Sequence, residues 1–228
     1  MDVNALNGPK MTEGQIQAYL ARLGIFETVP RTLAGLGRIQ LAHKIMVPFE
    51  NLDIVAGRPL SLDLHHLYDK IVVRGQGGVC AELNTLYNWL LYSMGFATEN
   101  ARVPLELTEG KVQSDGHCEY RYQWEPFFGW VQSQRRPGCD WERIQAFALE
   151  PQIDRDFDPV LFFFEKSPES NMNEFPRPSV YTPEGMLALR RHTFRVEKQG
   201  LVVSSTPVTP AEEIRLSREV FHLDTTGL

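Results

Sequence analysis

The sequence of 228 residues has no apolar run of about 18 residues or more, and this absence argues against a transmembrane helix. Its first nine residues lack both the basic stretch and the apolar stretch of a secretory signal, so we expect no export signal. It has only three cysteines, an odd number that does not provide a disulfide framework. These absences predict a cytoplasmic protein with no membrane partner.

Basic charge is scarce as well, since the net charge at pH 7 is -6 and the pI is near 5.6. No basic patch is interleaved with aromatic residues, so we expect no nucleic-acid partner. There is no C-x-x-C pair, and the adjacent His65 and His66 cannot share one helix face, so we predict no metal site. The glycine cluster at residues 75–78 lacks the Lys-Ser/Thr pair of a phosphate-binding loop.

Hydrophobic residues make up 43% and charged residues 23% of the chain, as in an ordinary globular protein. The length fits one large domain, or two or three small subdomains that share a core. In the first 95 residues apolar side chains recur at helical spacing, and Thr12-x-x-Gln15 is typical of a capping box. This part predicts a small helical bundle, with helices over residues 12–24, 33–45, 63–71 and 80–94.

The second half of the chain predicts strands followed by a last helix. Residues 119–124 and 128–132 alternate between polar and apolar side chains, which indicates a hairpin or a meander. The apolar run at residues 160–164 fits either a buried strand or a helix face, and residues 187–197 and 201–205 predict two further strands. Thr209-Pro210 begins a final helix, so the order of elements predicts an α+β fold.

Cys80 has the most informative position of the three cysteines. It directly follows a glycine turn and begins a predicted helix, where backbone N–H groups and the helix dipole favour a thiolate. A thiolate at such a place can act as a nucleophile. The alternative is that Cys80 is a small buried hydrophobic residue. For Cys118 and Cys139, in the strand-like region, a structural role is the simpler interpretation.

A cysteine nucleophile needs a base that accepts and returns a proton, and the sequence offers six histidines. Four of them fall in predicted helices, where histidines are more often surface or capping residues. The other two, His117 and His192, fall in strand-like segments after Cys80. The spacing along the sequence does not rank these two. The four histidines in predicted helices are His43, His65, His66 and His222.

Several sequence blocks follow one another at a distinctive spacing. In the first half they are VPFENL at 47–52, YDKIV at 68–72, GGVCAELN at 77–84 and ARV at 101–103; in the second half they include PLEL at 104–107, SPES at 167–170 and TPEG at 182–185. In order and spacing these blocks resemble those of the arylamine N-acetyltransferases. The resemblance extends over nearly the whole chain.

In that family a helical bundle, a β-barrel and an α/β lid enclose a Cys-His-Asp triad, arranged as in papain-like cysteine enzymes. The resemblance implies a bundle at residues 1–103, a short β-barrel region that could be incomplete at 104–150, and a lid at 151–228. It implies that Cys80 takes an acetyl group from the co-substrate acetyl-CoA and passes it to an arylamine or hydrazine nitrogen, a reaction of xenobiotic metabolism. It further implies that Gly77 and Gly78 shape the turn before Cys80, and that Glu82 and Asn84 support the helix.

The sequence departs from the family where the catalytic histidine and aspartate normally lie, and two registers account for this. In the first, His117, which lies 37 residues after Cys80, replaces the histidine, and Gln132 takes the place of the aspartate. In the second, the ARV block that ends at Val103 continues directly into the PLEL block that begins at Pro104. The stretch that the family has between these two blocks is then absent, and both triad partners are missing with it. We favour the second register because residues 116–147 match the family's later strands better. It predicts apolar faces left uncovered by the lost strands. Smaller departures are Gln76 in place of an arginine, and Val79 and Ala81 in place of bulkier side chains.

Two main functional hypotheses follow. The first is an arylamine N-acetyltransferase, with Cys80 as its nucleophile and His117 as its base, whose activity could be impaired. The alternative is a catalytically inactive family member that binds an acyl-CoA or a partner, or a truncated product without the middle segment. A third hypothesis is a related enzyme that uses another acyl-CoA. They differ in whether Cys80 is acylated near neutral pH.

Overall fold

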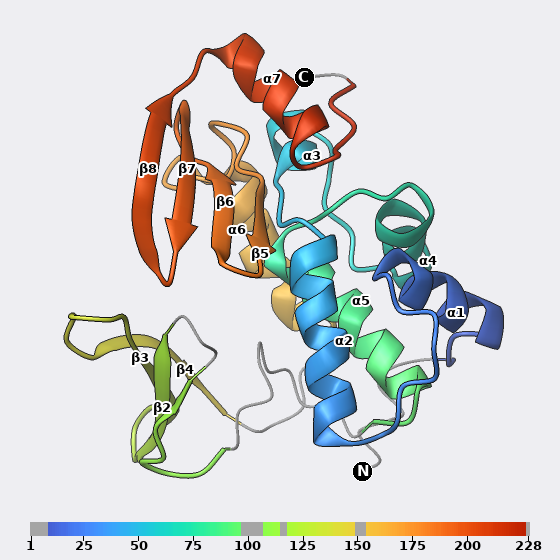
Figure 1. Ribbon diagram of the computed structural model, residues 1–228, viewed down its shortest axis with the longest axis vertical. Coiled ribbons are helices and arrows are strands. Elements are labelled where there is room, and N and C mark those ends of the chain that lie inside the picture. The colour runs from blue at the N-terminus through green and yellow to red at the C-terminus, as the bar shows by residue number, and fades with distance from the viewer. Residues whose placement is uncertain (1–8, 97–106, 115–117, 149–153, 227–228) are drawn as a thin grey trace.

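The computed structural model describes residues 9–96, 107–114, 118–148 and 154–226. Its first part is helical, as the periodicity predicts, and α1, α2 and α4 lie around α5 (Figure 1). A π-helical turn over Asp69–Val73 continues α4. The helices are α1 (Glu13–Arg22), α2 (Leu33–Met46), α3 (Leu52–Val55), α4 (Leu64–Tyr68) and α5 (Cys80–Ser93).

Local capping explains where these helices begin and end. The predicted capping box of α1 is confirmed: Thr12 Oγ1 accepts a hydrogen bond from Gln15 N at 3.2 Å, and Gln15 Oε1 accepts one from Thr12 N at 2.9 Å. Asp63 Oδ1 caps α4 by accepting from His66 N at 2.8 Å. After α5 the chain turns at Gly95, whose φ of 83° is a conformation that glycine adopts without strain.

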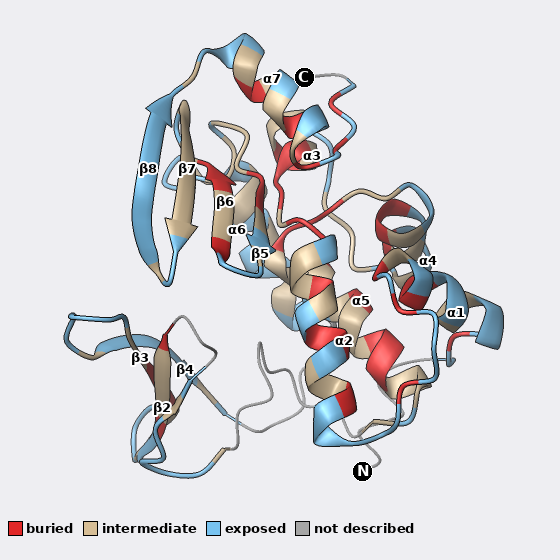
Figure 2. Ribbon diagram, in the orientation of Figure 1, coloured by how far each residue is buried: buried red, intermediate tan, exposed pale blue. Residues whose placement is uncertain are grey.

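The main hydrophobic core lies between these helices, and burial in Figure 2 is densest there. Its largest members are at most 2% exposed, and Trp89 also donates a hydrogen bond from its indole N–H to Pro9 O at 2.8 Å. Burial of each such side chain contributes about 1.5–3 kcal/mol. The core therefore holds α5 firmly, and with it the residue that begins α5. These members are Tyr19, Ile39, Leu67, Leu86 and Trp89.

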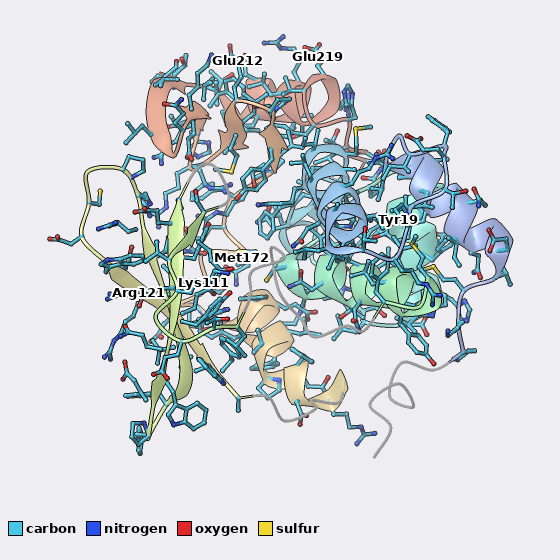
Figure 3. The ribbon with its side chains drawn as sticks, turned by 60° about the horizontal axis from the view of Figure 1, so that its bottom comes forward. Tyr19, Lys111, Arg121, Met172, Glu212 and Glu219 are labelled. Atoms are coloured by element: carbon cyan, nitrogen blue, oxygen red, sulfur yellow. The ribbon has the colours of Figure 1, made fainter. Side chains whose placement is uncertain are left out.

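A first antiparallel sheet follows, with strand order β1-β2-β3-β4. The predicted hairpin is present as β2 and β3, in which Tyr122 lies opposite Gln132. Figure 1 shows this sheet to one side of the helices, and the turned view of Figure 3 places its Arg121 well away from Tyr19 of the helical core. Its strands are β1 (Gln113–Ser114), β2 (Glu119–Glu125), β3 (Gly129–Arg135) and β4 (Glu142–Phe147).

A second antiparallel sheet has the order β5-β6-β7-β8. The single strand predicted over 187–197 is in fact two strands, because the chain turns at Arg191 and His192, both with positive φ. The apolar run 160–164 is part of a helix, and the final helix begins at Pro210 as predicted. The elements are a 3-10 turn (Asp154–Phe157), α6 (Asp158–Lys166), β5 (Ser179–Thr182), β6 (Gly185–Leu189), β7 (Thr193–Lys198), β8 (Leu201–Pro207) and α7 (Pro210–Glu219).

The β-barrel expected at 104–150 is not a closed barrel. Within the described residues, β1–β4 form an open sheet, and about five to eight strands are needed to close even a small barrel. Large apolar side chains lie open in this region, among them Trp124 on β2 at 53% exposed and Phe128, in the turn between β2 and β3, at 51%. Uncovered apolar faces are what the favoured register predicts. The junction of Val103 and Pro104, which that register proposes, lies outside the described residues.

Candidate functional site

Cys80 is the first residue of α5 and is partly exposed, whereas the preceding Val79 is fully buried. The fourteen-residue helix directs its positive dipole end and its unpaired N–H groups toward this position. Cys118 is buried just before β2 and accepts a hydrogen bond at its Sγ from Gln134 Nε2 at 2.8 Å, and Cys139 is exposed between β3 and β4. Of the three cysteines, only Cys80 is the first residue of a helix.

The turn before Cys80 is fixed by close backbone packing. Gly78 N donates to Pro48 O at 3.4 Å, and Glu50 N donates to Gly78 O at 3.0 Å. A Cβ atom on Gly77 would lie 2.1 Å from Pro48 O, so only glycine fits without movement of the backbone. The turn predicted from the glycine pair is therefore held against residues 48–50.

The same segment connects the turn to the second sheet. Phe49 and Ser179 exchange two backbone hydrogen bonds of 2.8 Å each, so β5 lies beside the segment that holds the turn. The buried side chain of Asn51 adds three hydrogen bonds to backbone groups of the chain that leads into β5. It donates to Met172 O at 2.6 Å and Phe175 O at 2.9 Å, and it accepts from Arg177 N at 2.7 Å. Residues 49–51 thus fasten the helical part to the second sheet.

A buried cluster of charges lies behind the turn, centred on Lys70. Its Nζ lies 2.6 Å from Asp53 Oδ2, 2.9 Å from Glu82 Oε2 and 3.7 Å from Glu50 Oε1. Glu82 Oε2 also accepts a hydrogen bond from Val79 N at 3.0 Å, which agrees with the supporting role expected for Glu82. Asn84, also expected to support the helix, is exposed.

Burial perturbs the acids of this cluster. It raises the pKa of Glu50 to about 7, against the opposing effect of the Lys70 ammonium. Burial also raises the pKa of Glu82, again opposed by Lys70. A polar cavity of about 250 Å³ adjoins the cluster and reaches Gln76, whose Oε1 accepts from Asp224 N at 3.0 Å. The C-terminal segment is therefore tied to the residue just before the glycine pair.

Lys70 and Asp53 could not be assigned to this site from the sequence. Lys70 lies in the helix predicted at 63–71 and Asp53 lies outside every predicted helix, and no spacing rule marks either residue, because the cluster joins residues from three separate elements. The signal available was weak: Glu50 and Asp53 flank the apolar Leu52, whose side chain is buried. Acidic residues so close to a buried position often need a buried cation as partner.

Two of the histidines in the described part of the chain have polar partners other than Cys80. His117, the predicted base, lies outside the described residues. His43 is buried and its Nε2 is 2.9 Å from Tyr19 Oη, and burial lowers the pKa of His43 to about 3. His192 Nδ1 is 3.1 Å from Glu213 Oε2. His222 was expected in a helix but lies beyond the end of α7, with a φ of 55°.

The first register placed Gln132 at the position of a residue that orients a histidine. In the structure Gln132 is buried in β3, and its Oε1 accepts a hydrogen bond from Gln145 Nε2 at 2.8 Å. Its acceptor oxygen therefore has a partner on the neighbouring strand.

Two further observations concern partners and ions. In the portions of the chain that are described, no set of three or more His, Cys, Asp or Glu side chains has the arrangement of a metal site. No helix there combines the length and the apolar character needed to cross a membrane.

The chain is similar in sequence to a family described as N-acetyltransferase, whose model matches residues 32–103 and 96–227. It is 28% identical to arylamine N-acetyltransferase 1 of Bos taurus over 233 residues, which cover 76% of this chain and 80% of that protein. The human protein of the same name gives the same identity and coverage. Since 76% of 228 residues is about 173, about 60 of the 233 aligned positions have no residue of this chain.

Solved structures give the same relationship. The arylamine N-acetyltransferase of Salmonella typhimurium superposes with a TM-score of 0.83 and is 25% identical, over 93% of this chain and 92% of that one. Arylamine N-acetyltransferase C of Bacillus anthracis has a TM-score of 0.81 at 21% identity, over 94% of this chain and 100% of that one, and so supports the fold.

Proposed function

This chain belongs to the arylamine N-acetyltransferase family, and on that premise we propose that it transfers an acetyl group from acetyl-CoA to an arylamine or hydrazine nitrogen through a thioester on Cys80. The observation that carries the proposal is the position of Cys80. It begins a firmly packed helix, follows a turn that only glycine can form, and is partly exposed.

The proposed reaction has two half-reactions. In the first, the Cys80 thiolate attacks the acetyl carbonyl carbon; a new S–C bond forms, the S–C bond to coenzyme A breaks, and coenzyme A leaves as a thiolate that takes up a proton. In the second, the acceptor nitrogen attacks the thioester; an N–C bond forms, Cys80 leaves as a thiolate, and the nitrogen loses one proton to a base. The positive dipole end of α5 lies at Cys80, beside the sulfur that carries negative charge when it attacks in the first step and when it leaves in the second.

The identity of the base that accepts the proton depends on the register. His117 is the candidate if the first register holds, and the papain-like arrangement of a full triad would then need an orienting group in place of the aspartate. The second register is supported by the two matched segments, which meet at 96–103, and by the roughly 60 unfilled positions in the alignment with the bovine relative. In that case acylation of Cys80 proceeds without the usual base and is slow.

We further propose that the chain functions as three regions: a helical bundle to residue 103, an open sheet region to residue 150, and an α/β lid beyond it. A cytoplasmic location follows from the expected access to acetyl-CoA, which is a substrate here and not a bound cofactor.

Intact-protein mass spectrometry over a time course from minutes to hours with acetyl-CoA, without acceptor, tests the proposal. We expect the wild type and Cys139→Ala to gain one acetyl group and Cys80→Ala to gain none. His117→Ala then tests the base: loss of acylation supports the first register, and unchanged acylation supports the second. If the folded wild type gains no mass over hours, transfer through Cys80 is refuted.

A second candidate function is supported by the open first sheet and the unfilled alignment positions. It is an inactive family member that binds an acyl-CoA or a protein partner. Binding of acetyl-CoA by calorimetry, without acetylation of Cys80, would support it. A product that neither binds nor reacts would instead fit a truncated chain.

A further inference from the structure

The buried ammonium of Lys70 lies among three carboxylates, two from the segment at α3 and one from α5. Glu50 precedes α3, Asp53 lies on α3 and Glu82 lies on α5. The side chain of Lys70 is only 4% exposed. Lys70 lies on the π-helical turn and contacts both the α3 segment and α5, so it fixes the relative positions of these three parts of the chain, since leaving any of these charges without a partner is costly.

One of these carboxylates also contacts the turn that leads into Cys80. Glu82 Oε2 accepts the hydrogen bond from Val79 N, and it lies so close to the turn that a Cβ on Gly78 would be 2.8 Å from it. Both oxygens of Glu82 lie within 3.0 Å of Lys70 Nζ. Lys70 therefore fixes Glu82, and Glu82 fixes the residue immediately before Cys80.

We propose that Lys70 is a positioning residue for Cys80: it holds Glu82 against the turn, and its charge balances the carboxylates gathered behind the start of α5. The inference deepens the proposed function and rests on it only in taking Cys80 as the nucleophile.

The charges around the cluster give this role a measurable sign. Three carboxylates surround one ammonium, so loss of the Lys70 charge leaves more negative charge behind Cys80 and disfavours its thiolate. Loss of the Glu82 charge has the opposite effect. Other charged groups also lie near the cluster or the turn. Arg58 pairs with Asp53, Arg74 pairs with Asp69, Asp224 lines the adjoining cavity, and Arg22 Nη2 donates to Gly75 O at 3.1 Å.

The rate of alkylation of Cys80 by iodoacetamide, followed against pH by peptide mass spectrometry, tests the proposal. We expect Lys70→Met to move the midpoint of this profile to higher pH by about half a pH unit or more, and Glu82→Gln to move it to lower pH. Arg74→Met is the matched control, because it removes a cation four residues from Lys70 that contacts a surface carboxylate instead. Exposed Cys139 serves as an internal reference for the reagent in every sample.

Near-UV circular dichroism checks that each variant is folded. If Lys70→Met does not fold, the double variant Lys70→Met/Glu82→Gln, which has the net charge of the wild type, decides the matter: its midpoint should return from the Glu82→Gln value toward the wild-type value. Lys70→Arg should retain the wild-type profile. Midpoints that shift in the same direction for Lys70→Met and Glu82→Gln, or that do not shift more than for Arg74→Met, overturn the proposal. Alkylation needs no acyl donor, so a failure of acetyl transfer leaves this test intact.

Discussion

Glu50 gives the sharpest prediction about stability, because its carboxyl is buried and its pKa is raised from 4.5 to about 7 in the folded protein. Between these two values the folded state binds more protons than the unfolded state, so this group lowers stability as the pH rises from about 4.5 to 7. The shift corresponds to about 3 kcal/mol of stability lost above pH 7.

Glu50→Gln should remove this loss. The carboxamide is neutral at every pH and keeps an oxygen for Leu52 N, which donates to Glu50 Oε2 at 2.6 Å. We expect the variant to match the wild type near pH 4 and to be more stable by up to about 3 kcal/mol at pH 8. Urea denaturation followed by tryptophan fluorescence at pH 4, 5, 6, 7 and 8 measures the difference.

Subtracting the variant from the wild type at each pH removes the contributions of all other titrating groups. Glu184→Gln is the matched control, because the pKa of this fully exposed carboxyl is lowered by its hydrogen bond to Lys198. Its difference curve should be flat from pH 5 to 8. A flat curve for Glu50→Gln as well would refute the reasoning, since it would mean that Glu50 is ionised in both states at pH 5.

Three more substitutions, one of them paired with a control, test the framework of the fold. Asn51→Ala removes hydrogen bonds to three backbone groups and should lower the free energy of unfolding by roughly 2–4 kcal/mol in urea; a loss below about 0.5 kcal/mol would show that water replaces them. Gly77→Ala should cost a few kcal/mol and slow Cys80 alkylation because its Cβ meets Pro48 O, whereas Gly14→Ala on α1, with open space around it, should stabilise by up to about 1 kcal/mol. For His43, whose folded pKa is lowered to about 3, stability is complete above pH 6.5 and is lost as the pH falls toward 3. His43→Gln should therefore flatten the decline in melting temperature on acidification, and an unchanged decline would contradict the burial argument.

The helical half of the fold could be predicted from the sequence because its signals are local. The Thr12–Gln15 box, the Asp63 cap and the glycine at position 95 each act within one turn of the chain, and all three end or begin helices as expected. The strands were predicted less well. The chain between β6 and β7 turns at Arg191 and His192, both with left-handed backbone. Arginine has no preference for that conformation, and the enrichment of histidine in it is too weak to locate a turn from the sequence.

The candidate site, too, could be predicted from the sequence only in part. Cys80 and its glycines are adjacent in the sequence, so the start of α5 could be inferred from it. The Lys70 cluster could not, because its carboxylates lie 12 to 20 residues away along the chain and meet only when α3 and α5 have packed. A buried ion cluster leaves no periodic pattern, and its members look like ordinary surface charges in a sequence.

The first sheet differs from the rest of the molecule in what it contributes to the framework around Cys80. The turn before Cys80, the Lys70 cluster and the Asn51 clamp use residues from the helical part and the second sheet, and none of their contacts comes from β1–β4. The first sheet and its turn instead expose Trp124 and Phe128, and the largest apolar side chains that the sheet buries are those of Tyr122 and Val131. Loss of strands from this region therefore leaves the framework of the nucleophile in place. What such a loss takes away is cover for the apolar side chains of the sheet and, if the second register holds, the groups that move the proton.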